Sequence, residues 1–121
     1  MPTDSLYVTH EVGDVTVVSF QQTQILDAMT IERMGTTLKQ LIATNTSGRF
    51  VFDFSHVTYM SSSALGMLIG LQRRILQEQA QLKLCGVRDD IMEVFRITKL
   101  DTVFDIYKDA HAAVEAFRKN L

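Results

Sequence analysis

The chain opens with alternating apolar and polar positions. The segments LYVTHE (residues 6–11) and VTVVSF (residues 15–20) are rich in β-branched and aromatic residues, which favour strands. The intervening VGD supplies a glycine for a tight turn. This pattern predicts a β-hairpin at the start of the fold.

After QQTQ the apolar period lengthens to three or four residues. One face of a helix is outlined by Ile31, Met34, Leu38, Leu41 and Ile42. Asp27 is placed to cap this helix, because a carboxylate there can accept a free backbone N–H of the first turn. The polar stretch TNTSG ends the helix.

Strand and helix patterns then alternate to the end of the chain. RFVFDF (49–54) is apolar on both alternating faces, as expected of a central strand covered on both sides. Further strands are predicted in QLKLCG (81–86) and TVFDIY (102–107). The inward positions of the three predicted helices are Leu65, Leu68, Leu71 and Ile75 after a start near Ser62; Ile91, Val94 and Phe95 within 88–98; and Ala110, Ala113, Val114 and Phe117.

The resulting order of elements is ββαβαβαβα. Such alternation requires crossover connections, so we predict an α/β fold with a mixed, mainly parallel sheet of about five strands and about four helices. A chain of 121 residues suits one hydrophobic core. We therefore expect a single domain over residues 1–121, with residues 1–5 as a flexible tail.

Composition narrows the classes of function. Apolar residues make up 46% and charged residues 21%, and a net charge of −2 gives no general attraction to nucleic acid or anionic lipid. The longest apolar run, ALGMLIGL, has 8 residues, whereas a membrane span needs about 20. Cys85 has no partner for an internal disulfide, and His10, His56 and His111 are too scattered for a zinc site. We expect a cytoplasmic protein with no metal, no cofactor, no nucleic-acid partner and no membrane insertion.

The segment YMSSSALG (59–66) places three hydroxyls in front of an apolar helix. It follows the strand 50–54, and in an open parallel sheet functional sites gather at the carboxyl ends of strands. A phosphate on a serine there would add about −1.5 to −2 charges and would be favoured by the helix dipole. The alternative is that one serine only caps the helix, which is a common role of serine.

The stretch FVFDFSHVTYMSSSALGMLIGLQRRI (50–75) resembles the signature of STAS domains of the bacterial anti-sigma factor antagonist family, roughly D-L-S-x-V-x-x-M-D-S-S-G-L-G-x-L. The positions in register are Asp53, Ser55, Val57, Met60, Ser62, Ser63, Leu65, Gly66 and Leu68. Upstream, ILDAMTIERM resembles the family segment ELDxxTAxxL, with Asp27 and Thr30 in register. The predicted order of elements also agrees with the family over essentially the whole chain.

This resemblance implies a binding switch that is not an enzyme. In the family, the antagonist binds an anti-sigma factor that is also a serine kinase, and phosphorylation of the first serine after the motif's aspartate releases it. A serine phosphatase restores binding. Carried over, the acceptor is Ser62, with Ser61 and Ser63 as rivals, and the implied partners are an anti-sigma factor serine kinase and a phosphatase. The implied partner-binding residues are Asp27, Asp53, Ser61, Ser63, Ala64, Gly66 and Met67.

Two positions depart from the family pattern. Ser61 replaces the aspartate, which removes a charge that could orient the acceptor, and Ser61 can itself cap the helix. Ala64 replaces the first glycine; its methyl favours the helix by up to about 1 kcal/mol but can hinder a close approach of a partner. The missing aspartate favours an alternative function, a STAS scaffold subunit of a signalling or lipid-transport complex that is not phosphorylated.

Three residues near the serines have a purely structural interpretation as well as a functional one. Asp53 is either a carboxylate beside the acceptor or the polar end of a buried strand, and Asp27 is either a cap or a residue beside the acceptor. A serine hydrolase using His56 is disfavoured, because there is no G-x-S-x-G elbow and the residues lie in one short loop.

The helix that follows the serines carries two further features. Arg73 and Arg74 fit its solvated side, and the alternative is that they contact the partner. Met67, Ile69 and Leu71 form either an exposed docking patch or a surface wedged between the sheet and a neighbouring helix.

Overall fold

A computed structural model describes residues 6–119, and the predicted tail, residues 1–5, lies outside them. Five strands form one sheet in the order β1 (Tyr7–Val12), β2 (Val15–Phe20), β4 (Arg49–Asp53), β6 (Gln81–Cys85) and β7 (Asp105–Tyr107). β1 and β2 form the predicted antiparallel hairpin, and the remaining neighbours are parallel. β4 lies in the centre of the sheet, as its two-sided apolar pattern predicts.

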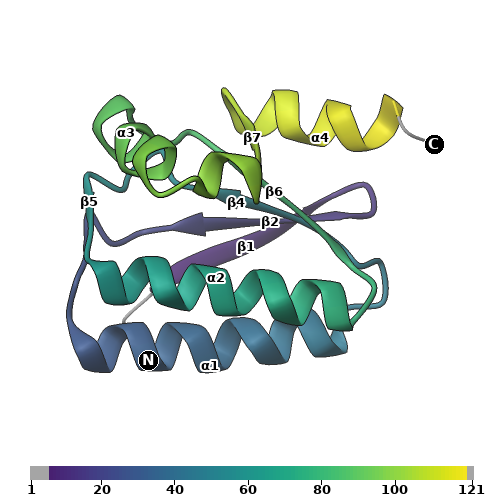
Figure 1. The fold of residues 1–121 in the computed structure, drawn as a ribbon. Coiled ribbons are helices and arrows are strands. Elements are labelled where there is room, and N and C mark those ends of the chain that lie inside the picture. Colours follow the sequence, from purple (N-terminus) through teal and green to yellow (C-terminus); the bar gives the residue numbers. More distant parts are fainter. Residues whose placement is uncertain (1–5, 120–121) are drawn as a thin grey trace.

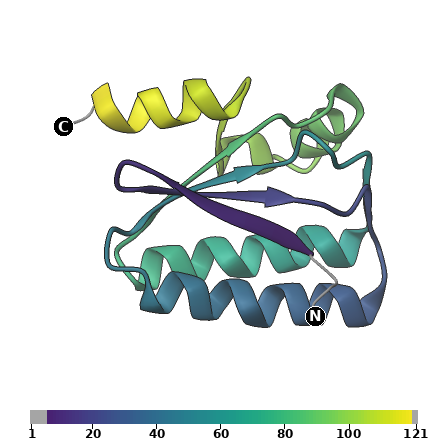
Figure 2. The same cartoon turned by 180° about the vertical axis from the view of Figure 1, so that it is seen from behind.

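Four helices cover the two faces of this sheet. α1 (Ala28–Thr44) and α2 (Ser62–Gln77) lie side by side across one face, and α4 (Ala110–Lys119) covers the other, as Figure 1 and the reverse view in Figure 2 show. α3 (Asp89–Ile97) and the 3₁₀ turn η1 (Leu100–Thr102) pack near β7. The predicted α/β class, with about five strands and four helices, is confirmed.

Each face of the sheet has its own apolar core. The larger core lies under α1 and α2 and includes Phe20, Phe52 and Phe54, whose rings are in contact. The smaller core lies under α4 and is built around Val51 and Phe117. Because successive strand residues point to opposite faces, β4 supplies side chains to both cores.

The structure corrects three details of the prediction. Val94 is 40% exposed rather than inward, because the short helix α3 lies at the rim of the molecule and buries only the narrow stripe of Ile91 and Phe95. Of the strand predicted over residues 102–107, only β7 forms, because Thr102 is the last residue of η1. Two strands that sequence analysis missed, β3 (Gln24–Ile25) and β5 (Tyr59–Met60), pair with each other in a small separate sheet.

Candidate functional site

The pairing of β3 with β5 brings the starts of α1 and α2 together at one end of the molecule (Figure 1). Backbone N–H groups of Thr58 and Tyr59 donate to the carbonyl of Thr23, and Ser61 N–H donates to the Ile25 carbonyl at 2.9 Å. Each connection then leads directly into a helix. Two helix N-termini, with their free N–H groups and positive dipole ends, therefore lie close together.

The three serines have different environments. Ser61 is half-buried and is the N-cap of α2, where its Oγ accepts the backbone N–H of Ala64 at 3.2 Å. Ser62 is the first helical residue and is exposed. Ser63 is also exposed, and it lines a shallow groove between α1 and α2 that Glu32 and Lys39 also line. The hydroxyl of Ser61 is thus used by the fold, whereas that of Ser62 faces solvent.

Asp27 caps α1 in the same way that Ser61 caps α2. Its Oδ2 accepts the backbone N–H of Thr30 at 2.9 Å and the Thr30 hydroxyl at 3.0 Å. These two hydrogen bonds lower the pKa of Asp27 below its ordinary value. The predicted capping role is confirmed, and it leaves an ionised carboxylate at this end of the molecule.

Asp53 shapes the loop that leads from β4 towards the serines. Its side chain is half-buried, and Oδ1 accepts the backbone N–H of Ser55 at 3.0 Å. Burial, together with the neighbouring carboxylate of Asp53, raises the pKa of Cys85 to about 12, so this thiol remains protonated. Asp53 therefore acts as the polar end of the strand and as a support for the loop.

Gly86 also supports this loop, although sequence analysis did not single it out. Its φ is +68°, and a Cβ on it would lie 2.9 Å from Asp53 Oδ1 and 3.0 Å from Ser55 N. Only glycine combines this left-handed backbone with so close an approach. The sequence does carry a signal for this role, since Gly86 comes directly after the predicted strand, a position where glycine often marks a turn.

An apolar groove of about 230 Å³ lies directly beside the serines, between β5 and α3. It is lined by Thr58, Tyr59, Met60, Leu65, Asp90, Ile91 and Val94. Tyr59 is 52% exposed and Ile97, one helical turn beyond Val94, is 73% exposed. This surface is not predicted from the sequence, because helical spacing predicts Val94 as a core residue.

The predicted partner-binding residues of α2 are not equally accessible. Ala64 is completely buried and points into the core, whereas Gly66 is exposed. Met67 is half-buried against α1, where a Cβ on Gly35 would lie 3.3 Å from its Cγ. Leu71 is fully buried, so the wedged interpretation of this helix face is confirmed.

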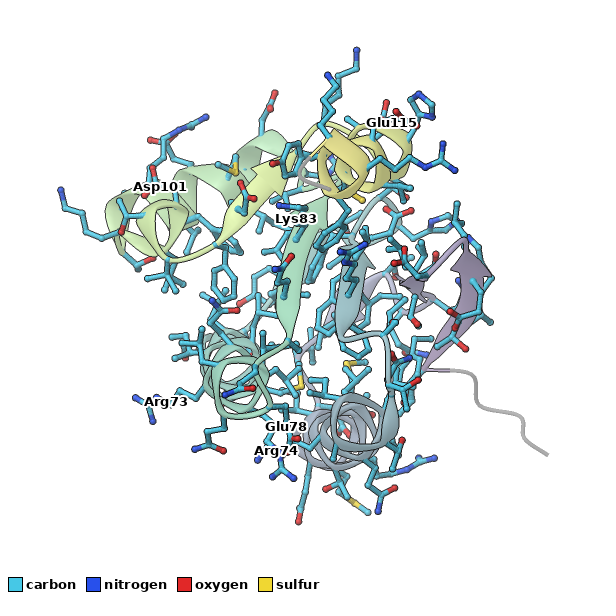
Figure 3. All side chains as sticks on the ribbon, turned by 90° about the vertical axis from the view of Figure 1, so that its right-hand side faces the viewer. Arg73, Arg74, Glu78, Lys83, Asp101 and Glu115 are labelled. Carbon is cyan, nitrogen blue, oxygen red and sulfur yellow. The ribbon has the colours of Figure 1, made fainter. Side chains whose placement is uncertain are left out.

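The remaining polar candidates are not joined to the serines. Within residues 6–119, His56 is exposed and no hydrogen bond links it to Asp53 or Ser62, so these residues do not form a triad. Arg74 pairs with Glu78 at 3.1 Å, and Arg73 projects away from the molecule near the other end of α2 (Figure 3). The described part of the chain gathers no three His, Cys, Asp or Glu side chains in a form that could hold a metal ion. No helix in the described residues is long and apolar enough to span a membrane.

The family model for the STAS domain matches residues 7–113. This chain belongs to the STAS domain family. It is 35% identical over 54 residues to the anti-sigma-B factor antagonist of Listeria monocytogenes, a match that covers 45% of this chain and 47% of that protein. It is 28% identical over 81 residues to the anti-sigma-B factor antagonist of Staphylococcus aureus, covering 67% of this chain and 74% of that protein.

A solved structure gives the same fold over nearly the whole chain. The anti-sigma-factor antagonist (STAS) domain protein of Planctomyces limnophilus superposes with a TM-score of 0.78 at 24% identity, covering 91% of this chain and 95% of that one. At this identity the likeness establishes the fold alone. The sequence match, in turn, spans about half the length of the Listeria protein.

Proposed function

We propose that this STAS protein is an anti-sigma factor antagonist, and that phosphorylation of Ser62 releases its anti-sigma factor. The observation that carries the proposal is the division of roles among the serines: Ser61 Oγ caps α2, while the Ser62 hydroxyl is exposed at the first helical residue. Ser62 is also the serine in register with the family acceptor. Ser63 is exposed as well, but it lines the groove between α1 and α2 and lies one position beyond the serine in register with the family acceptor.

The position of Ser62 explains how a phosphate can block binding without harming the fold. At the N-terminus of α2 the dianion meets a favourable dipole, worth about 0.3–1 kcal/mol. A docked partner, however, would have to remove water from that charge without supplying a counter-charge. An uncompensated buried charge costs about 3–5 kcal/mol, which weakens binding by about a hundredfold or more.

The groove between β5 and α3 supports the proposal, because it offers a partner an apolar anchor site next to the switch. Tyr59 and Val94 are exposed apolar side chains on its walls, and Met60 directly precedes the cap Ser61. Binding energy in protein interfaces concentrates in such pockets, where an aromatic or aliphatic side chain is enclosed. In this proposal the protein catalyses no reaction, and a serine kinase and a serine phosphatase add and remove the phosphate.

The test measures binding to a candidate anti-sigma factor that carries a serine-kinase domain. Ser62→Asp should weaken binding at least about a hundredfold, whereas Ser62→Ala should bind like the wild type. Thr46→Asp, which places the same carboxylate on an exposed residue of the loop after α1, is the matched control and should retain binding. If Ser62→Asp and Ser62→Ala bind equally well, Ser62 is not the switch.

The scaffold alternative, a STAS subunit that uses the same surface without phosphorylation, is favoured by Ser61 in place of the family aspartate. The two functions differ in their chemistry. Incubation with ATP and the kinase, followed by mass spectrometry, should place one phosphate on the peptide that contains Ser62. An unmodified peptide together with tight binding would support the scaffold.

A further inference from the structure

β1 is an open edge of the sheet. It is the outermost strand in the order of the sheet, and Figure 2 shows it nearest to the viewer. Its residues 8–11 are all exposed, so neither α1 nor α4 covers them. The other edge strand, β7, has only 3 residues. β1, with 6 residues, is therefore the longer unpaired edge.

The hydrogen bonding of the hairpin shows which backbone groups of β1 are free. The carbonyl of Leu6 accepts the N–H of Gln21 at 3.1 Å, and from there to Val12 the pairing with β2 is regular, without a bulge. In an antiparallel pair, residues alternate between bonding to the neighbour and pointing away from it. The N–H and C=O groups of Tyr7, Thr9 and Glu11 therefore point outward.

The edge lacks several of the usual devices that prevent strand pairing. Natural edge strands commonly carry lysine, proline or a bulge, and β1 (YVTHEV) has none of these. Its one acidic residue, Glu11, is held over its own sheet, because the Thr16 hydroxyl donates to both carboxylate oxygens at 2.9 and 3.1 Å. Val8 adds an apolar side chain that is 46% exposed.

We propose that β1 pairs in antiparallel fashion with β1 of a second copy of this chain, and so joins two sheets into one. Two identical strands pair in this way about a two-fold axis perpendicular to the sheet, which keeps each face on its own side. With the axis at Thr9, the outward groups of Tyr7 meet those of Glu11 of the second copy, and the two Thr9 residues face each other. This register forms about six backbone hydrogen bonds between the two copies. It pairs every outward N–H and C=O group of Tyr7, Thr9 and Glu11.

The side chains are compatible with this register. On the α4 face, Val8 lies opposite His10 of the second copy; on the other face, Tyr7 lies opposite Glu11 of the second copy. No two like charges face each other, which would destabilise a cross-strand pair. Moving the axis to His10 would place two histidines opposite each other and would leave Tyr7 without a partner. Pairing of β1 with β7 would generate filaments, but β7 is too short to match β1.

The dimer leaves the Ser62 end of each copy free. α2 packs over β6, which two strands, β4 and β2, separate from β1. The inference is therefore independent of the proposed switch. Two such sites on one assembly would bind a two-site partner with an avidity that a single site cannot reach.

Sedimentation velocity on the intact chain tests the proposal, and the wild type should pass from monomer to dimer between low and high micromolar concentration. Thr9→Lys places two lysines at the two-fold axis and should raise the dimer dissociation constant at least about tenfold. Thr46→Lys, the same charge change on an exposed residue of the loop after α1, should leave the dimer intact. Thr9→Pro should also give a monomer with an unchanged circular dichroism spectrum, because the N–H that it removes points outward. A wild type that is monomeric throughout, or a Thr9→Lys variant that dimerises like the wild type, would overturn the proposal.

Cross-linking then tests the register. Cys85 is fully buried with a pKa of about 12, so an engineered surface cysteine is the reactive thiol. A short bifunctional maleimide should link Thr9→Cys into a covalent dimer and should leave Thr46→Cys monomeric. Equal cross-linking of the two variants would show random collision rather than pairing at β1.

Discussion

Replacing Gly86 by alanine should destabilise the fold in two separable ways. The backbone at residue 86 has φ +68°, where an L side chain costs about 1–2 kcal/mol. The new Cβ would also lie 2.9 Å from Asp53 Oδ1, so the carboxylate must move. That movement weakens the 3.0 Å hydrogen bond from Ser55 N–H, whose loss costs about 1 kcal/mol or more. We expect a total loss of about 2–4 kcal/mol.

Two other glycines supply matched controls. Gly13 has φ +63°, but a Cβ on it would meet nothing within 4 Å, so Gly13→Ala should lose only the backbone part, about 1–2 kcal/mol. Gly66 is helical and equally open, so Gly66→Ala should stabilise the protein by up to about 1 kcal/mol. The chain has no tryptophan, so urea unfolding is followed by circular dichroism at low micromolar concentration. Equal losses for Gly86→Ala and Gly13→Ala would refute a role for the close approach to Asp53.

Three further predictions follow from the site and from the cover of the second sheet face. Hydrogen bonds lower the pKa of Asp27 in the folded state, so the stabilisation by its carboxylate is complete above the unfolded pKa of about 3.9 and disappears as the pH falls through the folded pKa. The difference in unfolding free energy between wild type and Asp27→Ala, measured by urea titrations at several pH values, should therefore shrink towards pH 2. A difference that stays constant with pH would contradict this. Val94→Lys should weaken binding of the proposed anti-sigma factor partner by about tenfold or more. Leu76→Lys, at an apolar site that is 66% exposed near the far end of α2, should leave this binding unchanged. Equal effects of the two variants in calorimetry would show that the groove is not part of the interface. Phe117→Ala should lower the free energy of unfolding in urea by about 3–5 kcal/mol. Phe117 is only 2% exposed, and the centroid of its ring lies 4.7 Å from Lys83 Nζ. A loss below about 1 kcal/mol would show that α4 contributes little to stability.

The elements that sequence analysis predicted well are those whose signal is local. The face of α1 and the buried strand β4 follow from apolar spacing within a few residues, and both are present. The capping role of Asp27 also depends only on residues within one turn. Val94 was misjudged because spacing assigns a residue to a helix face, while the neighbours of that face decide whether it is covered.

The candidate site was predicted in outline and completed by the fold. The position of Ser62 at a helix start came from the motif and the period of the following helix. The groove beside it combines residues of β5, α2 and α3, and no spacing rule connects segments so far apart. The close approach of Gly86 to Asp53 likewise depends on the pairing of β4 with β6.

Sequence alone thus determined the class of fold, the helix starts and the candidate acceptor, because these depend on interactions between residues close together in the chain. The tertiary structure decided which hydroxyl is engaged and which is exposed, which apolar side chains remain on the surface, and which strand forms the open edge. The physical reason is that burial and strand order depend on contacts between distant segments, such as the pairing of β3 with β5 that brings the two capped helix starts together.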